Sequence, residues 1–177
     1  KQSATRDLVL DLVEQLAVGD AIPSERQLSS DFGVSRLTVR AALDDLVRTG
    51  KVRYVGSSNF SGWQIAEADH VATEGGYSRF VSAQNHWSLL ERDVEAELVP
   101  AARHFGLGVL PYFPLANGLL TGKFTRDLRP ADTRIMRQRP QVADNAPWEV
   151  MDAYAAWCAT RGITMLQATF GWLLAAF

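Results

Sequence analysis

Apolar residues recur at helical spacing through the first fifty residues of the chain. Leucines four residues apart predict a first helix over residues 5–17. A second, shorter helix is predicted to begin at Ser24, which is followed three residues later by a glutamine in a capping-box pattern, and to end at Gly33. A third helix begins after Ser35 and carries an apolar stripe as far as Gly50. Three helices, with a tight turn between the second and third, predict a helix-turn-helix.

After residue 50, strand-like runs alternate with helical runs. The predicted strands are residues 51–56, 79–84 and 108–112, and the predicted helices are residues 63–74, 92–105, 148–161 and 165–176. A polar loop rich in arginine and proline is expected over residues 125–147. Because strands that alternate with helices form βα units, the second part should contain a parallel sheet. The sequence therefore predicts an α/β chain with two domains, residues 1–50 and 51–177.

Charge and composition narrow the functions that this organisation allows. The chain has 177 residues, 47% of them hydrophobic, and a net charge of −2. Residues 1–50 hold six Lys and Arg against eight Asp and Glu, so the strong basic excess of many nucleic-acid binders is missing. The single cysteine, Cys158, excludes a disulfide within the chain and favours a reducing compartment. Since no apolar run approaches about 18 residues, we expect a cytoplasmic protein without a membrane span.

The third predicted helix has side chains suited to the major groove of DNA. Arg36 and Arg40 lie four residues apart, on one helix face, with Thr38 between them. Taken alone, these arginines would equally suit a solvated helix face. The runs at residues 23–28, 32–40 and 42–43 resemble the winged helix-turn-helix of GntR-family regulators, although residues 57–61 do not match the return strand of the wing. This resemblance implies double-stranded DNA as the partner, contacted by Arg26, Ser35, Arg36, Thr38 and Arg40.

A second resemblance covers most of the remaining chain. Residues 50–60, residues 80–92 and residues 108–123 resemble the fifth, sixth and seventh strands of the (β/α)8 barrel of aldo-keto reductases, each with the loop that follows. Ligands of such barrels bind at the C-terminal ends of the strands. The resemblance implies a nicotinamide amide held by polar side chains, a nicotinamide ring stacked on an aromatic one and a pyrophosphate along the last loop. The residues implied are Ser58, Asn59, Gln84, Tyr112, Leu115, Gly118 and Lys123.

The three segments that resemble aldo-keto reductases do not include the catalytic residues of that family. The family uses an Asp-Tyr-Lys-His tetrad on its first four barrel strands, and His70, His86 and His104 do not correspond to the tetrad histidine. We therefore expect no catalytic residue, no metal site, no enzyme activity, and either no cofactor or weakly bound NADP.

The two resemblances meet in residues 41–50, a leucine-rich helix that suits either parent. A partial barrel of about three parallel strands leaves sheet edges unpaired, which favours self-association. Three functions stay open: a DNA-binding transcription regulator with a catalytically incomplete appendage, an NADP-binding fragment of an aldo-keto reductase, and a recombinant chimera with no evolved activity. The complete recognition-helix motif favours the first.

Overall fold

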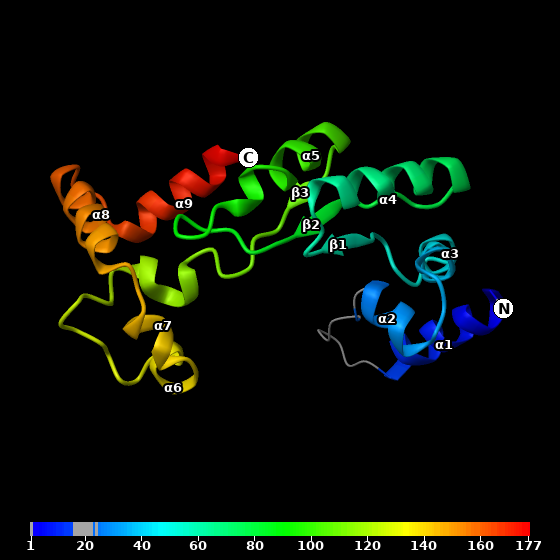
Figure 1. Ribbon diagram of the computed structural model, residues 1–177, viewed down its shortest axis with the longest axis horizontal. Helices are drawn as coiled ribbons and strands as arrows, with labels where there is room; N and C mark the ends of the chain where they lie inside the picture. Colours follow the sequence, from blue (N-terminus) through cyan, green and yellow to red (C-terminus); the bar gives the residue numbers. More distant parts are fainter. Residues whose placement is uncertain (1, 16–22, 24) are drawn as a thin grey trace. The chain divides into compact units, whose positions relative to one another are not determined.

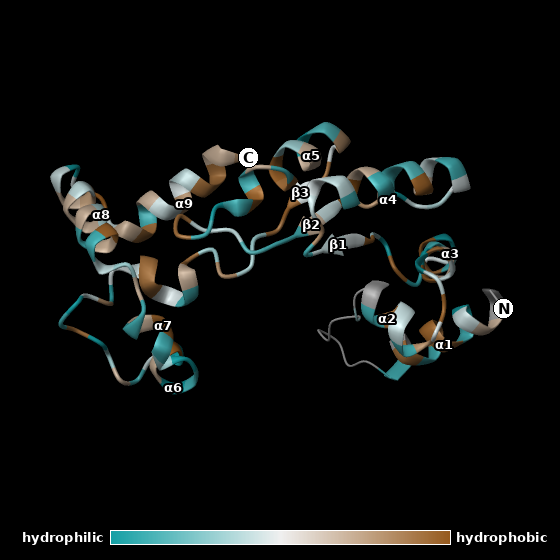
Figure 2. Cartoon of the chain, in the orientation of Figure 1, coloured by the Kyte–Doolittle hydropathy of each residue, from teal (hydrophilic) through white to brown (hydrophobic). Residues whose placement is uncertain are grey.

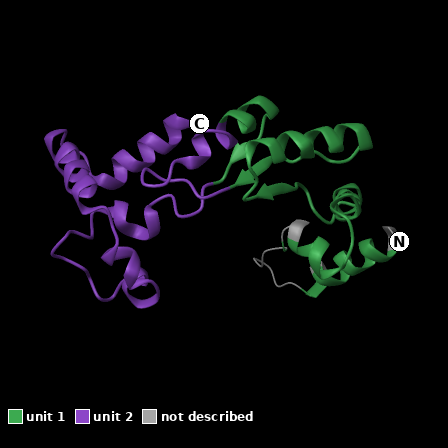
Figure 3. Ribbon diagram, in the orientation of Figure 1, with its two compact units in different colours: residues 1–84, 100–110 green, residues 85–99, 111–177 purple. Residues whose placement is uncertain are grey.

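The computed structural model describes residues 2–15, 23 and 25–177 (Figure 1). The chain divides into two compact units, which Figure 3 distinguishes by colour. Unit 1 contains residues 1–84 and 100–110, and unit 2 contains residues 85–99 and 111–177. Neither unit begins or ends at residue 50, where the sequence predicted a domain boundary. The two predicted domains stay a prediction.

Three helices open unit 1, close to the places that the hydrophobic pattern predicted. They are α1 (Gln2–Gln15), α2 (Glu25–Asp31) and α3 (Arg36–Arg48). The hydroxyl of Ser35 caps α3 and accepts a hydrogen bond from the backbone N–H of Thr38 at 3.2 Å. This bond satisfies a donor that the first turn of a helix leaves unpaired. The predicted capping box at Ser24 lies outside the described residues.

A small apolar core joins α1 to α3. Val9 is fully buried, and Ala42 and Leu46 are 3% and 1% exposed. Complete burial of an aliphatic side chain such as Val9 or Leu46 stabilises a fold by about 1.5–3 kcal/mol. An exposed ion pair between Arg6 and Asp45, at 3.2 Å, lies beside it.

Unit 1 also contains the sheet, whose three strands are all parallel. They are β1 (Gly56–Ser58), β2 (Ser82–Gln84) and β3 (Gly108–Val109), hydrogen-bonded in the order β1-β2-β3. Helix α4 (Gly62–Gly75) connects the first two strands in the chain, and α5 (Leu98–Phe105) precedes the third. The predicted α/β class with a partial parallel sheet is confirmed.

The first strand begins five residues later than the pattern predicted. Val52 stands between two polar residues, as in the alternating pattern of a strand. Its backbone N–H, however, donates to the carbonyl of Leu46 at 3.1 Å. Its side chain packs against the core between α1 and α3. The residues after α3 therefore complete the helical part before the chain enters the sheet.

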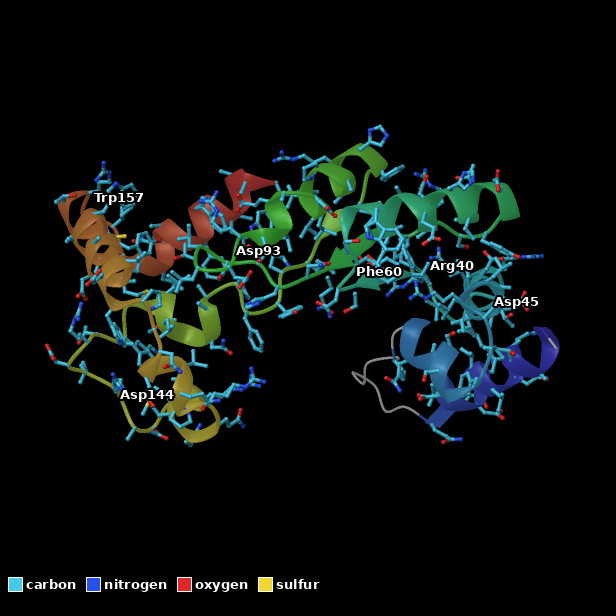
Figure 4. The ribbon with its side chains drawn as sticks, viewed as in Figure 1. Arg40, Asp45, Phe60, Asp93, Asp144 and Trp157 are labelled. Carbon is cyan, nitrogen blue, oxygen red and sulfur yellow. The ribbon has the colours of Figure 1, made fainter. Side chains whose placement is uncertain are left out.

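Helix α3 is fastened to the segment that leads into β2. The guanidinium carbon of Arg40 lies 3.9 Å from the centre of the Phe80 ring, and the arginine is only 4% exposed. One turn further, the carboxylate of Asp44 accepts hydrogen bonds from the backbone N–H and hydroxyl of Ser78 at 2.6 and 2.7 Å. Arg40 also lines a cavity between α3 and α4, together with Phe60, which is labelled beside it in Figure 4. The middle of α3, at Arg40 and Asp44, thus contacts the α/β part of unit 1.

Unit 2 is built from short helices around one core. Its elements are the 3-10 helices η1 (Asp93–Glu95) and η2 (Ala116–Thr121) and the α-helices α6 (Arg134–Gln138), α7 (Pro140–Asp144), α8 (Trp148–Thr160) and α9 (Met165–Ala176). Ten buried residues form the core: Ala116, Leu119, Leu120, Phe124, Ile135, Ala143, Trp148, Met151, Cys158 and Met165. The last two helices lie where the sequence predicted them.

The predicted loop over residues 125–147 contains helices α6 and α7. Thr133 caps α6, and Pro140 opens α7, where a missing N–H costs nothing. Ile135 and Ala143 anchor the two helices in the core of unit 2. Each helix is only five residues long, too short for an apolar period to show in the sequence.

Most residues of α9 are apolar, as the colouring of the cartoon shows (Figure 2). Leu166, Phe170 and Leu174 lie at helical spacing and are 39%, 41% and 81% exposed. Among the described residues, no helix has both the length and the hydropathy of a membrane span.

Candidate functional site

Three predicted cofactor residues meet at the C-terminal ends of β1 and β2 in unit 1. Ser58 and Gln84 are the last residues of their strands and are partners in the parallel register. Asn59 follows at once, and its backbone N–H donates to the carbonyl of Gln84 at 2.9 Å. Its side-chain amide donates to the hydroxyl of Ser58 at 3.3 Å. The structure therefore groups the three polar side chains on one exposed edge of the sheet.

Left-handed backbone conformations mark the strand ends and the loop after Tyr112. Among the described residues, four that are not glycine have positive φ: Asn59 (56°), Phe113 (51°), Ala116 (48°) and Asn117 (58°). Such conformations are uncommon for residues with a side chain, and each costs about 1–3 kcal/mol. Two of the four are asparagines, which adopt this conformation more readily than most residues.

Tyr112 belongs to an aromatic cluster in unit 2. Its ring stacks on His86, with centroids 5.1 Å apart and an angle of 8° between the planes. Phe113 meets both rings edge-on, at 5.7 Å from His86 and 5.5 Å from Tyr112. The backbone N–H of Tyr112 donates to the carbonyl of Asn85 at 3.0 Å. These contacts hold the Tyr112 ring in a defined position. The resemblance in the sequence implied that this ring stacks on a nicotinamide.

The loop after Tyr112 borders a cavity of about 210 Å³. Leu115 and Gly118, both predicted to follow the pyrophosphate, line it together with Arg134 and Arg139 from the α6–α7 region. Lys123 is exposed and lies outside the lining. The cavity thus combines two of the three predicted loop residues with two guanidinium groups.

The two arginines of the cavity contact neutral groups, so these contacts do not compensate their positive charges. The Nε of Arg134 donates to the side-chain oxygen of Gln138 at 2.9 Å, and the guanidinium of Arg139 lies 5.2 Å from the centre of the Phe113 ring. Both partners are neutral. A guanidinium is permanently charged and pairs with phosphate oxygens through two parallel hydrogen bonds, so this chemistry suits an anionic ligand.

Sequence reasoning missed Arg134 and Arg139 because they fall in the stretch assigned to a loop. The arginine-rich composition of that stretch was the available signal. His86 was considered only as a tetrad histidine, and its contact with Tyr112 depends on the register of two chain segments that no local pattern reveals.

A half-buried carboxylate, that of Glu95, holds the segment after β2 in unit 2. Glu95 accepts hydrogen bonds from the indole N–H of Trp87 at 3.0 Å and from two guanidinium nitrogens of Arg92 at 2.8 and 2.6 Å. The bond from Arg92, opposed in part by burial, lowers the pKa of Glu95 below its usual value. Trp172 packs edge-on against Trp87 at 5.6 Å, which joins this segment to α9.

The residues predicted to contact DNA have other environments in the structure. Arg40 is buried against Phe80, and the hydroxyls of Ser35 and Thr38 lie 2.8 Å apart at the start of α3. Arg36 is exposed and lines a cavity between α3 and α4. The side chain of Arg26 lies outside the described residues.

Comparison with known proteins identifies relatives along most of the chain. The model of the aldo/keto reductase family matches residues 22–176. YrpG of Bacillus subtilis, named an uncharacterized oxidoreductase, is 37% identical over 134 residues, which is 76% of this chain and 40% of YrpG. Versiconal hemiacetal acetate reductase of Aspergillus parasiticus is 30% identical over 150 residues, 81% of this chain and 43% of that protein.

A solved structure agrees with these matches. The glycerol dehydrogenase of Gluconobacter oxydans superimposes with a TM-score of 0.58 at 28% identity, over 78% of this chain and 41% of that one. The chain therefore spans about two fifths of the length of the relatives that it matches.

These matches correct the main functional prediction. The prediction of a GntR-like, DNA-binding transcription regulator is wrong, because the family match begins at residue 22 and includes α2 and α3, the helices assigned to DNA reading. The physical reason is visible at Arg40 and Asp44, which α3 uses to pack against the α/β part of unit 1.

The expectation that the chain is not an enzyme is also wrong. It rested on the missing tetrad blocks, whereas the relatives are an oxidoreductase, a reductase and a dehydrogenase by name. The second resemblance noted in the sequence is confirmed: the chain belongs to the aldo/keto reductase family.

Proposed function

We propose that the chain is the cofactor-binding part of an NADP-dependent aldo-keto reductase. The observation that carries this proposal is the cavity in unit 2, where the predicted loop residues Leu115 and Gly118 face Arg134 and Arg139. Of the two cofactor expectations, none or NADP, an arginine-lined cavity supports the second.

The strand ends of unit 1 suit the amide of a nicotinamide. A carboxamide has one acceptor oxygen and two N–H donors. Ser58, Asn59 and Gln84 offer a hydroxyl and two amide side chains, which include both donors and acceptors. Their position at the C-terminal ends of parallel strands is where barrels of this class bind ligands. We assign these three residues to the amide.

The cluster around Tyr112 suits the nicotinamide ring itself. A flat aromatic side chain held by ring contacts and a backbone hydrogen bond loses little freedom when a ligand stacks on it. A nicotinamide bound there would supply or accept a hydride. The role of Tyr112 is to orient that ring.

The cavity in unit 2 suits phosphate groups of the cofactor. Arg134 and Arg139 supply positive charge to the cavity, next to Leu115 and Gly118 of the loop. Since hydrogen bonds to charged groups contribute about 1.5–3 kcal/mol each, two arginines can determine the affinity of the site.

Titration with NADPH, followed by quenching of the fluorescence of the five tryptophans, tests the proposal. We expect saturable binding, weakened about tenfold by Arg134→Ala and by Arg139→Ala. The matched control is Arg137→Ala, because Arg137 lies on the same helix but pairs with Asp132 at 2.9 Å and does not line the cavity. Equal losses in all three variants would indicate a nonspecific charge effect, and absence of saturable binding would refute the proposal.

A further inference from the structure

A cavity of about 310 Å³ lies between helices α3 and α4 of unit 1. Sites for small molecules are cavities of this kind, which combine apolar walls with a few polar groups. Helix α3 contributes Arg36, Leu37 and Arg40, helix α4 contributes Gln64, Glu67, Ala68 and Val71, and Phe60 precedes α4. None of these residues has a role in the proposed function, so the cavity is a separate candidate site.

The two helices give the cavity walls of opposite charge. Arg36 and Arg40 lie four residues apart on α3 and therefore share one face of that helix. The guanidinium of Arg40, a residue that Figure 4 labels, is held over the ring of Phe80, and the residue is 4% exposed. On the α4 wall the charged group is the carboxylate of Glu67. The α3 wall is thus positive and the α4 wall negative.

Arg36 and Glu67 do not compensate each other across the cavity. Both are exposed, and among the described residues neither forms an ion pair, although they line the same space. A ligand with both charges can contact both walls, because its carboxylate pairs with a guanidinium and its ammonium donates to a carboxylate. A ligand with a single charge would attract one wall and repel the other.

The rest of the lining is largely apolar. Leu37 is 51% exposed, and Phe60 and Val71 are half-buried on the cavity wall. Ala68 forms part of the wall and is 7% exposed. Because covering such side chains removes apolar surface from water, an apolar group on the ligand would add to its affinity.

We propose that this cavity binds an α-amino acid with an apolar side chain. Its carboxylate contacts Arg36 on the α3 wall, its ammonium contacts Glu67 on the α4 wall, and its side chain covers Leu37. The inference goes beyond the proposed function and does not depend on it.

Calorimetric titration with L-phenylalanine, hydrocinnamate and phenethylamine tests this inference. The three compounds share an aromatic ring on a short chain, and they carry both charges, the carboxylate alone and the ammonium alone. We expect saturable binding that is tightest for L-phenylalanine. Each of the other two should bind roughly three- to tenfold more weakly, because each lacks one partly exposed ion pair.

Two variants locate the charges of the ligand. Arg36→Gln should weaken the binding of L-phenylalanine and hydrocinnamate but not that of phenethylamine. Glu67→Gln should weaken the binding of L-phenylalanine and phenethylamine but not that of hydrocinnamate. The matched controls are Arg48→Gln and Glu74→Gln, exposed positions in the last turns of the same two helices and outside the cavity lining. Both controls should bind all three compounds as the unmodified chain does.

Three results would overturn the inference. They are the absence of saturable binding of L-phenylalanine, losses of equal size in the control variants, and undiminished binding of L-phenylalanine by Glu67→Gln. In each case the proposed function stands, because NADPH binding is measured separately and depends on Arg134 and Arg139 in unit 2.

Discussion

The carboxylate of Asp44 on α3 accepts two hydrogen bonds from Ser78, one from its backbone N–H at 2.6 Å and one from its hydroxyl at 2.7 Å. Asp44 is 5% exposed and Ser78 is half-buried, so removing the carboxylate leaves the two donors of Ser78 without their partner in a site that water reaches poorly. Leaving buried donors unsatisfied costs about 1–3 kcal/mol. We therefore expect Asp44→Ala to lower the free energy of unfolding by about that amount, measured by urea denaturation.

The neighbouring residue provides the control for this prediction. Asp45 pairs with Arg6 at 3.2 Å, and both side chains are more than a third exposed. Exposed ion pairs contribute about 0–1 kcal/mol, so Asp45→Ala should change stability little. Equal destabilisation by the two variants would show that α3 is not fastened through Asp44.

Gly56 permits the close approach of β1 to β2. A Cβ atom built on Gly56 would lie 2.9 Å from the carbonyl oxygen of Ser82, closer than real Cβ contacts allow. Gly56→Ala should therefore separate the first strand from the second and destabilise the chain by about 1–3 kcal/mol. It should also weaken NADPH binding, because the pairing of Ser58 with Gln84 depends on the same register.

Gly108 is the matched position for that substitution. It opens β3, and a Cβ there would meet only the carbonyl oxygen of Val81, at an ordinary 3.8 Å. Gly108→Ala should leave stability and NADPH binding nearly unchanged. The reverse order of effects would contradict the close-approach argument.

The sequence predicted those parts of the fold that local patterns determine. Helices α8 and α9 were found within a residue of their ends, because Gly162 separates two continuous helical runs. The parallel order of the strands followed from alternation with helices. Ser58, Asn59 and Gln84 lie together at the C-terminal ends of β1 and β2, and their assignment to a cofactor stays a prediction.

The sequence did not predict features that depend on contacts between distant segments. The burial of Arg40 against Phe80 joins residues forty positions apart, and a pattern that suited a DNA-reading helix gave no sign of it. Arg134 and Arg139 reach their cavity only because Ile135 and Ala143 anchor two short helices in the core. Both errors concern side chains whose role is set by tertiary packing, which local helical spacing does not determine.

Stability should depend on pH through Glu95. Hydrogen bonding to Arg92 lowers the pKa of Glu95 in the folded state, so its ionised form stabilises the fold above the unfolded pKa of about 4.5. That contribution should be lost progressively as the pH falls below this value toward the folded pKa. Glu95→Gln should flatten the dependence, measured as the urea midpoint between about pH 6 and about pH 3. Glu149→Gln, an exposed change at the start of α8, should leave it in place. An unchanged slope in Glu95→Gln would refute the role of this carboxylate.

The sequence predicted self-association, and we predict that an exposed apolar stripe in unit 2 forms the contact. The exposed stripe of Leu166, Phe170 and Leu174 lies on a helix without an ionisable side chain, and stripes of this kind commonly mark contact surfaces. In the described part of the chain, β1 and β3 also pair on one side only. We predict a mass above the 19.5 kDa of one chain in sedimentation at micromolar concentration.

Because a buried unpaired charge is costly, Leu174→Glu should raise the dissociation constant of the self-associated form at least about tenfold. Leu128→Glu, at an exposed leucine away from α9, should not. A single-chain mass at every concentration would contradict the prediction, and equal effects of the two variants would place the contact elsewhere.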